Sequence, residues 1–147
     1  MKLPTKLEQR IKEFQGVIDA PEYNGVIAAL ITEASSLPKM GISVDYNSNM
    51  GSRHESREDG FRIFIRMNGE TGRGKVLLYD ILHELGHYHD PVKLPLERQH
   101  DQALRREREQ RAWEWADWKF NTYPELEADR AWYTDYKQQC LATYSTK

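Results

Sequence analysis

The sequence predicts one α+β domain over residues 1–147, because its apolar residues change their spacing twice along the chain. In the first third, apolar residues recur every three or four positions, which is the spacing of helices that bury one face. In the middle they alternate with polar residues, as in half-buried strands, and helical spacing returns in the last half. A chain of 147 residues is long enough to bury one hydrophobic core.

The N-terminal part is expected to form two helices and then two strands. Apolar spacing predicts a helix over residues 7–17, and Pro21 begins a second helix that the stretch 35–38 ends. Alternation predicts strands over residues 41–46 and 61–67, and the polar stretch 47–60 between them reads as an exposed loop. The second strand is either an interior strand or an edge strand to which an extended peptide could add.

The C-terminal half is expected to form three helices. The first covers about Lys75–His89, and its apolar stripe contains Leu78, Ile81, Leu82 and Leu85. Two prolines, at positions 91 and 95, break the chain before a long helix from about Leu96 to Phe120. A turn at Tyr123-Pro124-Glu125, with proline at the first helical position, then begins a last helix that ends near Leu141.

The composition restricts the classes of function. The net charge of −2 gives no basic field for nucleic acid, and no apolar run approaches the roughly 20 residues that span a bilayer. The first ten residues lack the apolar segment of a secretory signal, and Cys140 is the only cysteine, so we expect a cytoplasmic protein without an intrachain disulfide. Any metal ion would therefore be held by histidines and carboxylates.

One short motif carries recognisable chemistry: the helix predicted over residues 75–89 contains His83-Glu84-Leu85-Gly86-His87. Histidines four residues apart project from one face of a helix, so both imidazoles can bind one Zn²⁺. Glu84 stands where the metalloprotease motif places the general base for the water that zinc activates. Gly86 costs about 1 kcal/mol relative to alanine in a helix, which favours a close approach of another backbone. We interpret the motif as a catalytic zinc site rather than a chance pattern on a solvated face.

Catalytic zinc needs a third protein ligand and an open fourth position. A metzincin would supply a histidine at position 93, where this chain has lysine. The long helix offers three acids instead: Glu107, Glu109 and Glu114. Glu109 shares the predicted core-facing stripe with Ala112 and Ala116, whereas the helical rotation of about 100° per residue turns Glu107 and Glu114 away. We expect Glu109 to be the third ligand, with Glu107 and Glu114 as alternatives.

Neither His89 nor His100 is expected to bind the metal. His89 lies two residues beyond His87, so it points away from the metal face toward the surface. His100 lies in a charged run, and the pattern around His54 assigns that residue no role. No spacing singles out a residue that would stabilise the oxyanion.

Two segments together resemble the ImmA/IrrE family of small metallopeptidases. That family carries HELGH and, some twenty or more residues later, a helix of the form E-x-x-A-x-x-aromatic-A, which this chain matches with Glu109, Ala112, Trp115 and Ala116. The turn at 123–126 is similar to the family's proline-containing turn, and the resemblance covers about residues 77–126. The chain departs from many members at Arg111, where they carry an acid.

The resemblance implies a zincin-like fold with N-terminal helices, a small antiparallel sheet, the HExxH helix and C-terminal helices. It implies His83, His87 and Glu109 as zinc ligands and Glu84 as catalytic base. We therefore expect a zinc-dependent endopeptidase that hydrolyses a protein substrate, by resemblance a helix-turn-helix repressor of a phage or mobile element. The main alternative is a zinc-containing regulatory module that inactivates a repressor without cleaving it. A weaker alternative is an interaction protein with a chance motif.

Overall fold

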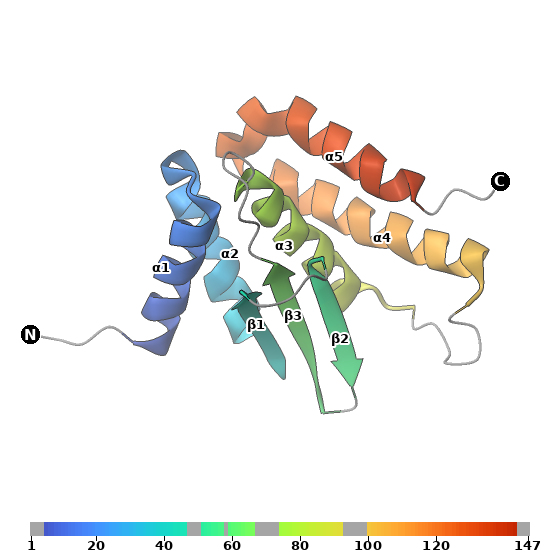
Figure 1. Ribbon diagram of the computed structural model, residues 1–147, viewed down its shortest axis with the longest axis horizontal. Coiled ribbons are helices and arrows are strands. Elements are labelled where there is room, and N and C mark those ends of the chain that lie inside the picture. Colours follow the sequence, from blue (N-terminus) through green and yellow to red (C-terminus); the bar gives the residue numbers. More distant parts are fainter. Residues whose placement is uncertain (1–4, 47–50, 58, 67–73, 93–99, 144–147) are drawn as a thin grey trace, which may run out of the picture. The chain divides into compact units, whose positions relative to one another are not determined.

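The computed structural model describes residues 5–46, 51–57, 59–66, 74–92 and 100–143, and Figure 1 shows their helices and strands. Contacts group the chain into two compact units, Met1–Ile81 and Leu82–Lys147, and helix α3 (Gly74–His89) passes from the first unit into the second. The described residues form helices and a three-stranded mixed sheet, so the predicted α+β class is confirmed. The single-domain organisation stays a prediction.

Two helices begin the first unit, as the apolar spacing predicts. Helix α1 spans Lys6–Ile18, and the hydroxyl of Thr5 caps it by accepting a hydrogen bond from the Glu8 N–H at 3.1 Å. A 3₁₀ turn, Pro21–Tyr23, precedes helix α2 (Asn24–Ser36), so the proline begins this turn rather than the helix itself. Helix α2 contributes five buried residues to the core, which are Val26, Ile27, Leu30, Ile31 and Ala34.

The sheet is mixed, which corrects the expected antiparallel arrangement. Its strands β1 (Met40–Asp45), β2 (Arg53–Arg57) and β3 (Gly60–Arg66) lie in the order β1-β3-β2 (Figure 1). Strands β2 and β3 form an antiparallel hairpin, whereas β1 runs parallel to β3 with Ile42 opposite Ile63. The chain reverses into β2 and again into β3, so β3 regains the direction of β1. Because β3 lies between the other two strands, its pairing with β1 is parallel.

Strand β2 falls within the segment predicted as an exposed loop, so that prediction is wrong for residues 53–57. Its sequence, Arg-His-Glu-Ser-Arg, contains no apolar residue and therefore lacks the alternation that indicates a strand. Backbone pairing with β3 forms the strand instead. Strand β3 has paired neighbours on both sides, and Phe61, Ile63 and Ile65 are buried on one face, so of the two alternatives it is an interior strand.

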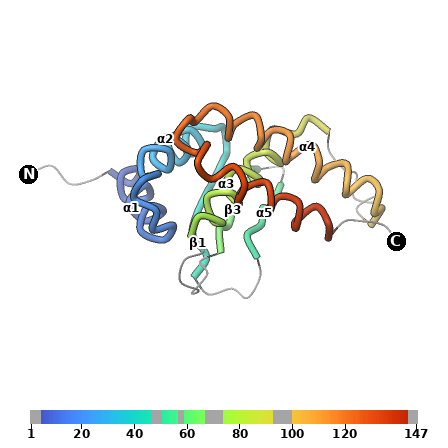
Figure 2. Tube along the Cα trace, turned by 90° about the horizontal axis from the view of Figure 1, so that it is seen from above, coloured from blue at the N-terminus to red at the C-terminus, as the bar shows by residue number. Residues whose placement is uncertain are grey.

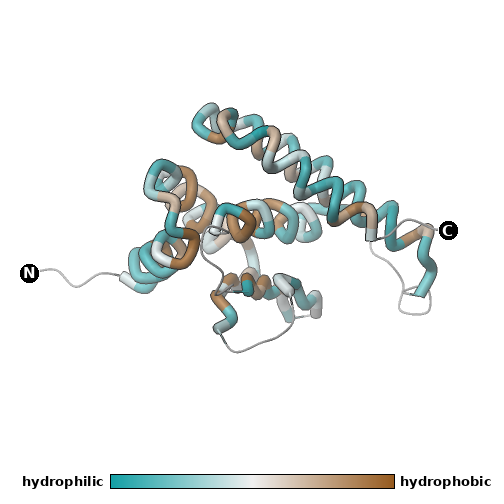
Figure 3. The backbone as a smooth tube through the Cα atoms, turned by 45° about the horizontal axis from the view of Figure 1, so that its top comes forward, coloured by the Kyte–Doolittle hydropathy of each residue, from teal (hydrophilic) through white to brown (hydrophobic). Residues whose placement is uncertain are grey.

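Helix α4 (Gln102–Asn121) is the long helix of the second unit. The Asp101 carboxylate caps it by accepting the Leu104 N–H at 3.1 Å, and the predicted start at Leu96 lies outside the described residues. Much of the helix is hydrophilic (Figure 3), and its buried residues are Glu109, Ala112, Trp113, Ala116, Lys119 and Phe120. Among the described helices, none has both the length and the apolar character that crossing a bilayer requires.

Helix α5 (Arg130–Ala142) follows a 3₁₀ stretch, Pro124–Asp129, that begins with proline as predicted. Figures 1 and 2 show α5 alongside α4. Two polar contacts join these helices: the Tyr133 hydroxyl donates to one Asp117 oxygen at 2.7 Å, and Lys137 donates to the other at 2.9 Å. The helical order predicted for the C-terminal half is therefore confirmed over the described residues.

Candidate metal centre

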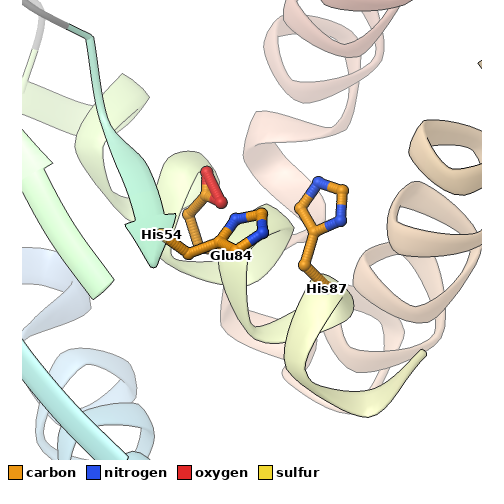
Figure 4. A group of neighbouring side chains, drawn as sticks. All are labelled: His54, Glu84 and His87. Atoms are coloured by element: carbon orange, nitrogen blue, oxygen red, sulfur yellow. The ribbon is translucent and has the colours of Figure 1, made fainter. Parts of the chain in front are cut away.

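Helix α3 presents the two motif histidines on adjacent turns of one face. Leu82 and Leu85 on the same helix are fully buried, so its apolar stripe is anchored in the interior. The rings of His83 and His87 have centroids 4.7 Å apart, as a spacing of four residues predicts. Figure 4 shows Glu84 and His87 projecting from α3, and both residues are buried.

Glu109 on α4 brings its carboxylate to both histidines. Its Oε2 lies 2.6 Å from Nε2 of His83, and its Oε1 lies 3.1 Å from Nε2 of His87. The two Nε2 atoms are themselves 3.2 Å apart. Glu109 is buried, so its predicted place on the inward side of the helix is confirmed. Two helices that are distant in sequence thus bring together two imidazole nitrogens and a carboxylate.

The two alternative acids of α4 lie away from this group. Glu107 and Glu114 are both exposed, in agreement with their predicted rotation away from the core-facing stripe. On a regular helix they stand about 200° and about 140° from Glu109. Of these three acids, only Glu109 meets the histidines.

Helices α3 and α4 approach so closely that their backbones touch at Gly86. A Cβ atom on Gly86 would overlap the carbonyl oxygen of Ala112 and would lie 2.8 Å from its carbonyl carbon. Only glycine leaves room for this carbonyl group, so the close approach predicted from Gly86 is confirmed. Glu109 lies one helical turn before Ala112, and the same contact therefore brings it within reach of the histidines.

Burial and hydrogen bonding shift the three ionisable groups in different directions. Burial lowers the pKa of His83, but hydrogen bonds to Glu109 and Glu84 outweigh burial and raise that pKa to about 10. Burial lowers the pKa of His87, and its hydrogen bond to Glu109 offsets this only in part. Burial would raise the pKa of Glu109, but hydrogen bonds from both histidines outweigh it and lower that pKa. In this arrangement His83 is an imidazolium beside an ionised Glu109 at neutral pH.

The three donor atoms fit one tetrahedral zinc ion. Two imidazoles and one carboxylate form a known donor set of catalytic zinc, with a fourth position left open. Ligands about 2.0–2.1 Å from a tetrahedral ion lie about 3.3–3.4 Å from one another. The two Nε2 atoms are 3.2 Å apart and Oε1 of Glu109 lies 3.1 Å from His87, both close to this value. The 2.6 Å contact of His83 is made by the other carboxylate oxygen, Oε2, and would lengthen if that oxygen were the ligand. The side chains can thus hold an ion with small adjustments.

Glu84 lies next to the donor atoms without belonging to their group. Its Oε2 is 3.5 Å from Nδ1 of His83, the ring nitrogen that does not face Glu109, and the residue is 3% exposed. On another side of His83 the Trp113 ring stacks at 4.5 Å between centroids, with 14° between the planes. This stacking was not predicted, although Trp113 follows Glu109 by four residues and therefore shares its helix face.

His89 and His100 do not belong to this donor group. His89 is exposed and stacks on Trp115 at 4.6 Å between centroids, which confirms its predicted surface position. His100 is also exposed. His54 lies on β2 in the first unit, where its ring stacks on Phe61 at 5.0 Å between centroids.

Gly86→Ala is expected to destabilise the protein, although alanine is the better helix former. The added Cβ forces Ala112 away from α3, and overpacking of this kind costs about 1–3 kcal/mol. Gly16→Ala is the matched control: Gly16 lies within α1, where a Cβ meets no described atom within 4 Å, so this change should stabilise the protein by about 0.5–1 kcal/mol. Urea unfolding followed by circular dichroism compares the free energies. Equal stabilisation by both changes would contradict the backbone contact.

No protein-family model, no curated protein and no solved structure matches this chain. No relative therefore assigns it to a family or lends it an activity. Its function has to be inferred from the chemistry of its own residues, chiefly His83, Glu84, His87 and Glu109.

Proposed function

We propose that this chain is a zinc-dependent endopeptidase with a zincin-like fold. His83, His87 and Glu109 hold the zinc ion, and Glu84 is the general base. The observation that carries the proposal is the convergence of three donor atoms from two helices, with a further acid beside them. A structural zinc site is closed by four protein ligands, whereas a catalytic site keeps one position open. Among the described residues of the second unit, no fourth ligand atom joins the group of His83, His87 and Glu109.

The chain's own residues supply the acid–base part of the chemistry. When bound, zinc would polarise the scissile carbonyl group and lower the pKa of water toward about 7. Glu84 accepts at a carboxylate oxygen the proton that water loses as it attacks the carbonyl carbon. Glu84 then donates this proton to the nitrogen of the leaving amine. His83 and His87 would bind the zinc ion through Nε2. The stacked ring of Trp113 holds the imidazole of His83 in place.

The proposed substrate is a protein, in particular a helix-turn-helix repressor of a phage or mobile element. This part of the proposal rests on the resemblance of residues 83–87 and 109–116 to the ImmA/IrrE family. Such a repressor acts in the cytoplasm, which is the setting expected from the sequence. The proposal involves no direct contact with nucleic acid or with a membrane.

One observation favours the alternative, a zinc-containing regulatory module that inactivates a repressor by binding. Glu84 is 3% exposed and lies 3.5 Å from Nδ1 of His83, so it is placed to orient a ligand as well as to move a proton. A module would need only the orienting role. An enzyme needs both, and a substitution of Glu84 distinguishes the two functions.

Glu109→Gln is expected to weaken zinc binding by at least about 100-fold, beyond the range of roughly 10–100-fold seen for groups that only orient a ligand. The amide is nearly isosteric but carries no charge, so the ion loses its anionic ligand. Glu114→Gln, at an exposed position of the same helix, should leave the affinity unchanged. Competition with a chromogenic chelator measures both dissociation constants. The same affinity in both variants would remove Glu109 from the ligand set.

Zinc uptake near pH 7 is expected to release about one proton from His83. The pKa of His83 is raised to about 10, so its imidazole is protonated at neutral pH and must lose that proton to bind a metal. The apparent affinity should therefore rise with pH between about 6 and 8. Calorimetry in buffers with different ionisation enthalpies counts the released protons. If the heat of binding does not depend on the buffer, His83 is already neutral.

Glu84→Gln is expected to retain zinc and to lower cleavage of the repressor by at least about 100-fold, which is typical when a general base is lost. Glu107→Gln, an exposed change on α4, serves as the control and should keep full activity. The assay mixes purified protein with repressors encoded beside its gene and follows cleavage by mass spectrometry. A Glu84→Gln variant that relieves repression as well as the unaltered chain would establish the binding module instead.

A further inference from the structure

A buried ion pair joins the end of α3 to α4. Asp90 comes directly after α3, and its side chain is 3% exposed. Its Oδ1 accepts two hydrogen bonds at 2.9 Å, one from the Val92 N–H and one from Nε of Arg111. Arg111 belongs to α4, and its side chain is 30% exposed. Because a buried carboxylate without its cation is strongly unfavourable, the pair holds these two points of the chain together.

The ion pair lies on one flank of the contact between the two helices. Ala112 is the residue of α4 that faces Gly86. Its chain neighbours, Arg111 and Trp113, lie about 100° to either side of it around the helix. Arg111 binds Asp90 on one flank, and Trp113 stacks on the ring of a motif histidine on the other. The two flanking contacts together restrain the rotation of α4 on the side that faces α3.

The rotation of α4 decides whether Glu109 reaches the histidines. A side chain ends about 5–6 Å from the helix axis, so a rotation of about 20° displaces the carboxylate by about 2 Å. Metal–ligand distances are defined to about 0.2 Å. The contact between Gly86 and Ala112 has no long side chain that could resist such a rotation. On the side of α3, the flanking contacts resist it.

We propose that Asp90 and Arg111 are positioning residues of the metal centre, and that their ion pair fixes the rotation at which Glu109 meets His83 and His87. The inference rests on the proposed zinc site. Both residues act through the helices that they connect rather than on the ion. The resemblance to the ImmA/IrrE family does not imply this pair, because many members carry an acid where this chain has Arg111.

Zinc affinity of the 147-residue chain, measured by chelator competition, tests the proposal. Arg111→Gln removes the cation, and Asp90→Asn keeps an oxygen for the Val92 N–H while removing the charge. Each change is expected to weaken zinc binding about 10–100-fold, the range found for groups that orient metal ligands. Arg111→Lys keeps a cation and should recover most of the affinity. The loss of zinc affinity in the double variant should not exceed the larger of the two losses in the single variants. Both changes break the same interaction, so their effects do not add.

The second unit offers a matched control. Lys137 donates to Asp117 at 2.9 Å, so this pair also joins α4 to another helix, but it does so on the side of α5. Lys137→Gln is expected to leave zinc affinity unchanged. A second readout is the visible absorption of the Co²⁺-loaded protein, which reports tetrahedral coordination and should weaken in Arg111→Gln but not in Lys137→Gln.

Two results would overturn the positioning role. One is a folded Arg111→Gln protein whose zinc affinity stays within about twofold of the unaltered chain, far from the expected range. The other is an equal loss in Lys137→Gln, which would show general destabilisation. If circular dichroism shows that Arg111→Gln does not fold, Asp90→Asn compared with Arg111→Lys decides by the same criteria. If the unaltered chain binds no zinc, the metal centre itself fails and the positioning role fails with it.

Discussion

The backbone contact between Gly86 and Ala112 is the constraint on which the proposed site depends. A helix normally keeps its neighbours at a distance set by side chains, and here one partner has none at the point of contact. This contact brings the carboxylate of Glu109 to both His83 and His87, which span only one turn of α3. A larger residue at either contact position would move the donor side chains apart, although the donor residues themselves would be unchanged.

Close packing also buries charge, and the second unit compensates that charge locally. Glu84, Asp90 and Glu109 are all buried, and each has a basic group beside it. His83 is the basic group beside Glu84 and Glu109, and Arg111 is the basic group beside Asp90. Breaking a buried pair leaves an uncompensated charge, which typically costs about 3–5 kcal/mol. The acids proposed to bind the metal and to accept the proton of water are thus also a constraint on stability, and the pair of Asp90 and Arg111 connects the two properties.

Helical periodicity predicted a large part of the molecule, and the strands show its limits. The helices and the interior strand have apolar residues at regular intervals, because one face of each lies against the core. Strand β2 has no such residues, since backbone pairing at the side of β3 holds it instead. The parallel or antiparallel direction of strand pairing could not be predicted either. Alternation indicates a strand, but it does not indicate which strand becomes its neighbour. For this reason the prediction of a loop at residues 53–57 and the prediction of an antiparallel sheet were both wrong.

The sequence by itself determined that His83 and His87 share a helix face, that Gly86 requires a close neighbour, and that Glu109 turns inward. The first and the third follow from the fixed rotation and rise of an α-helix, and the second follows from the cost of glycine within a helix. Only the tertiary structure decided that Glu109 meets those histidines, that Trp113 stacks on His83, and that Asp90 pairs with Arg111. These contacts join separate helices, and their geometry depends on packing that no local spacing records.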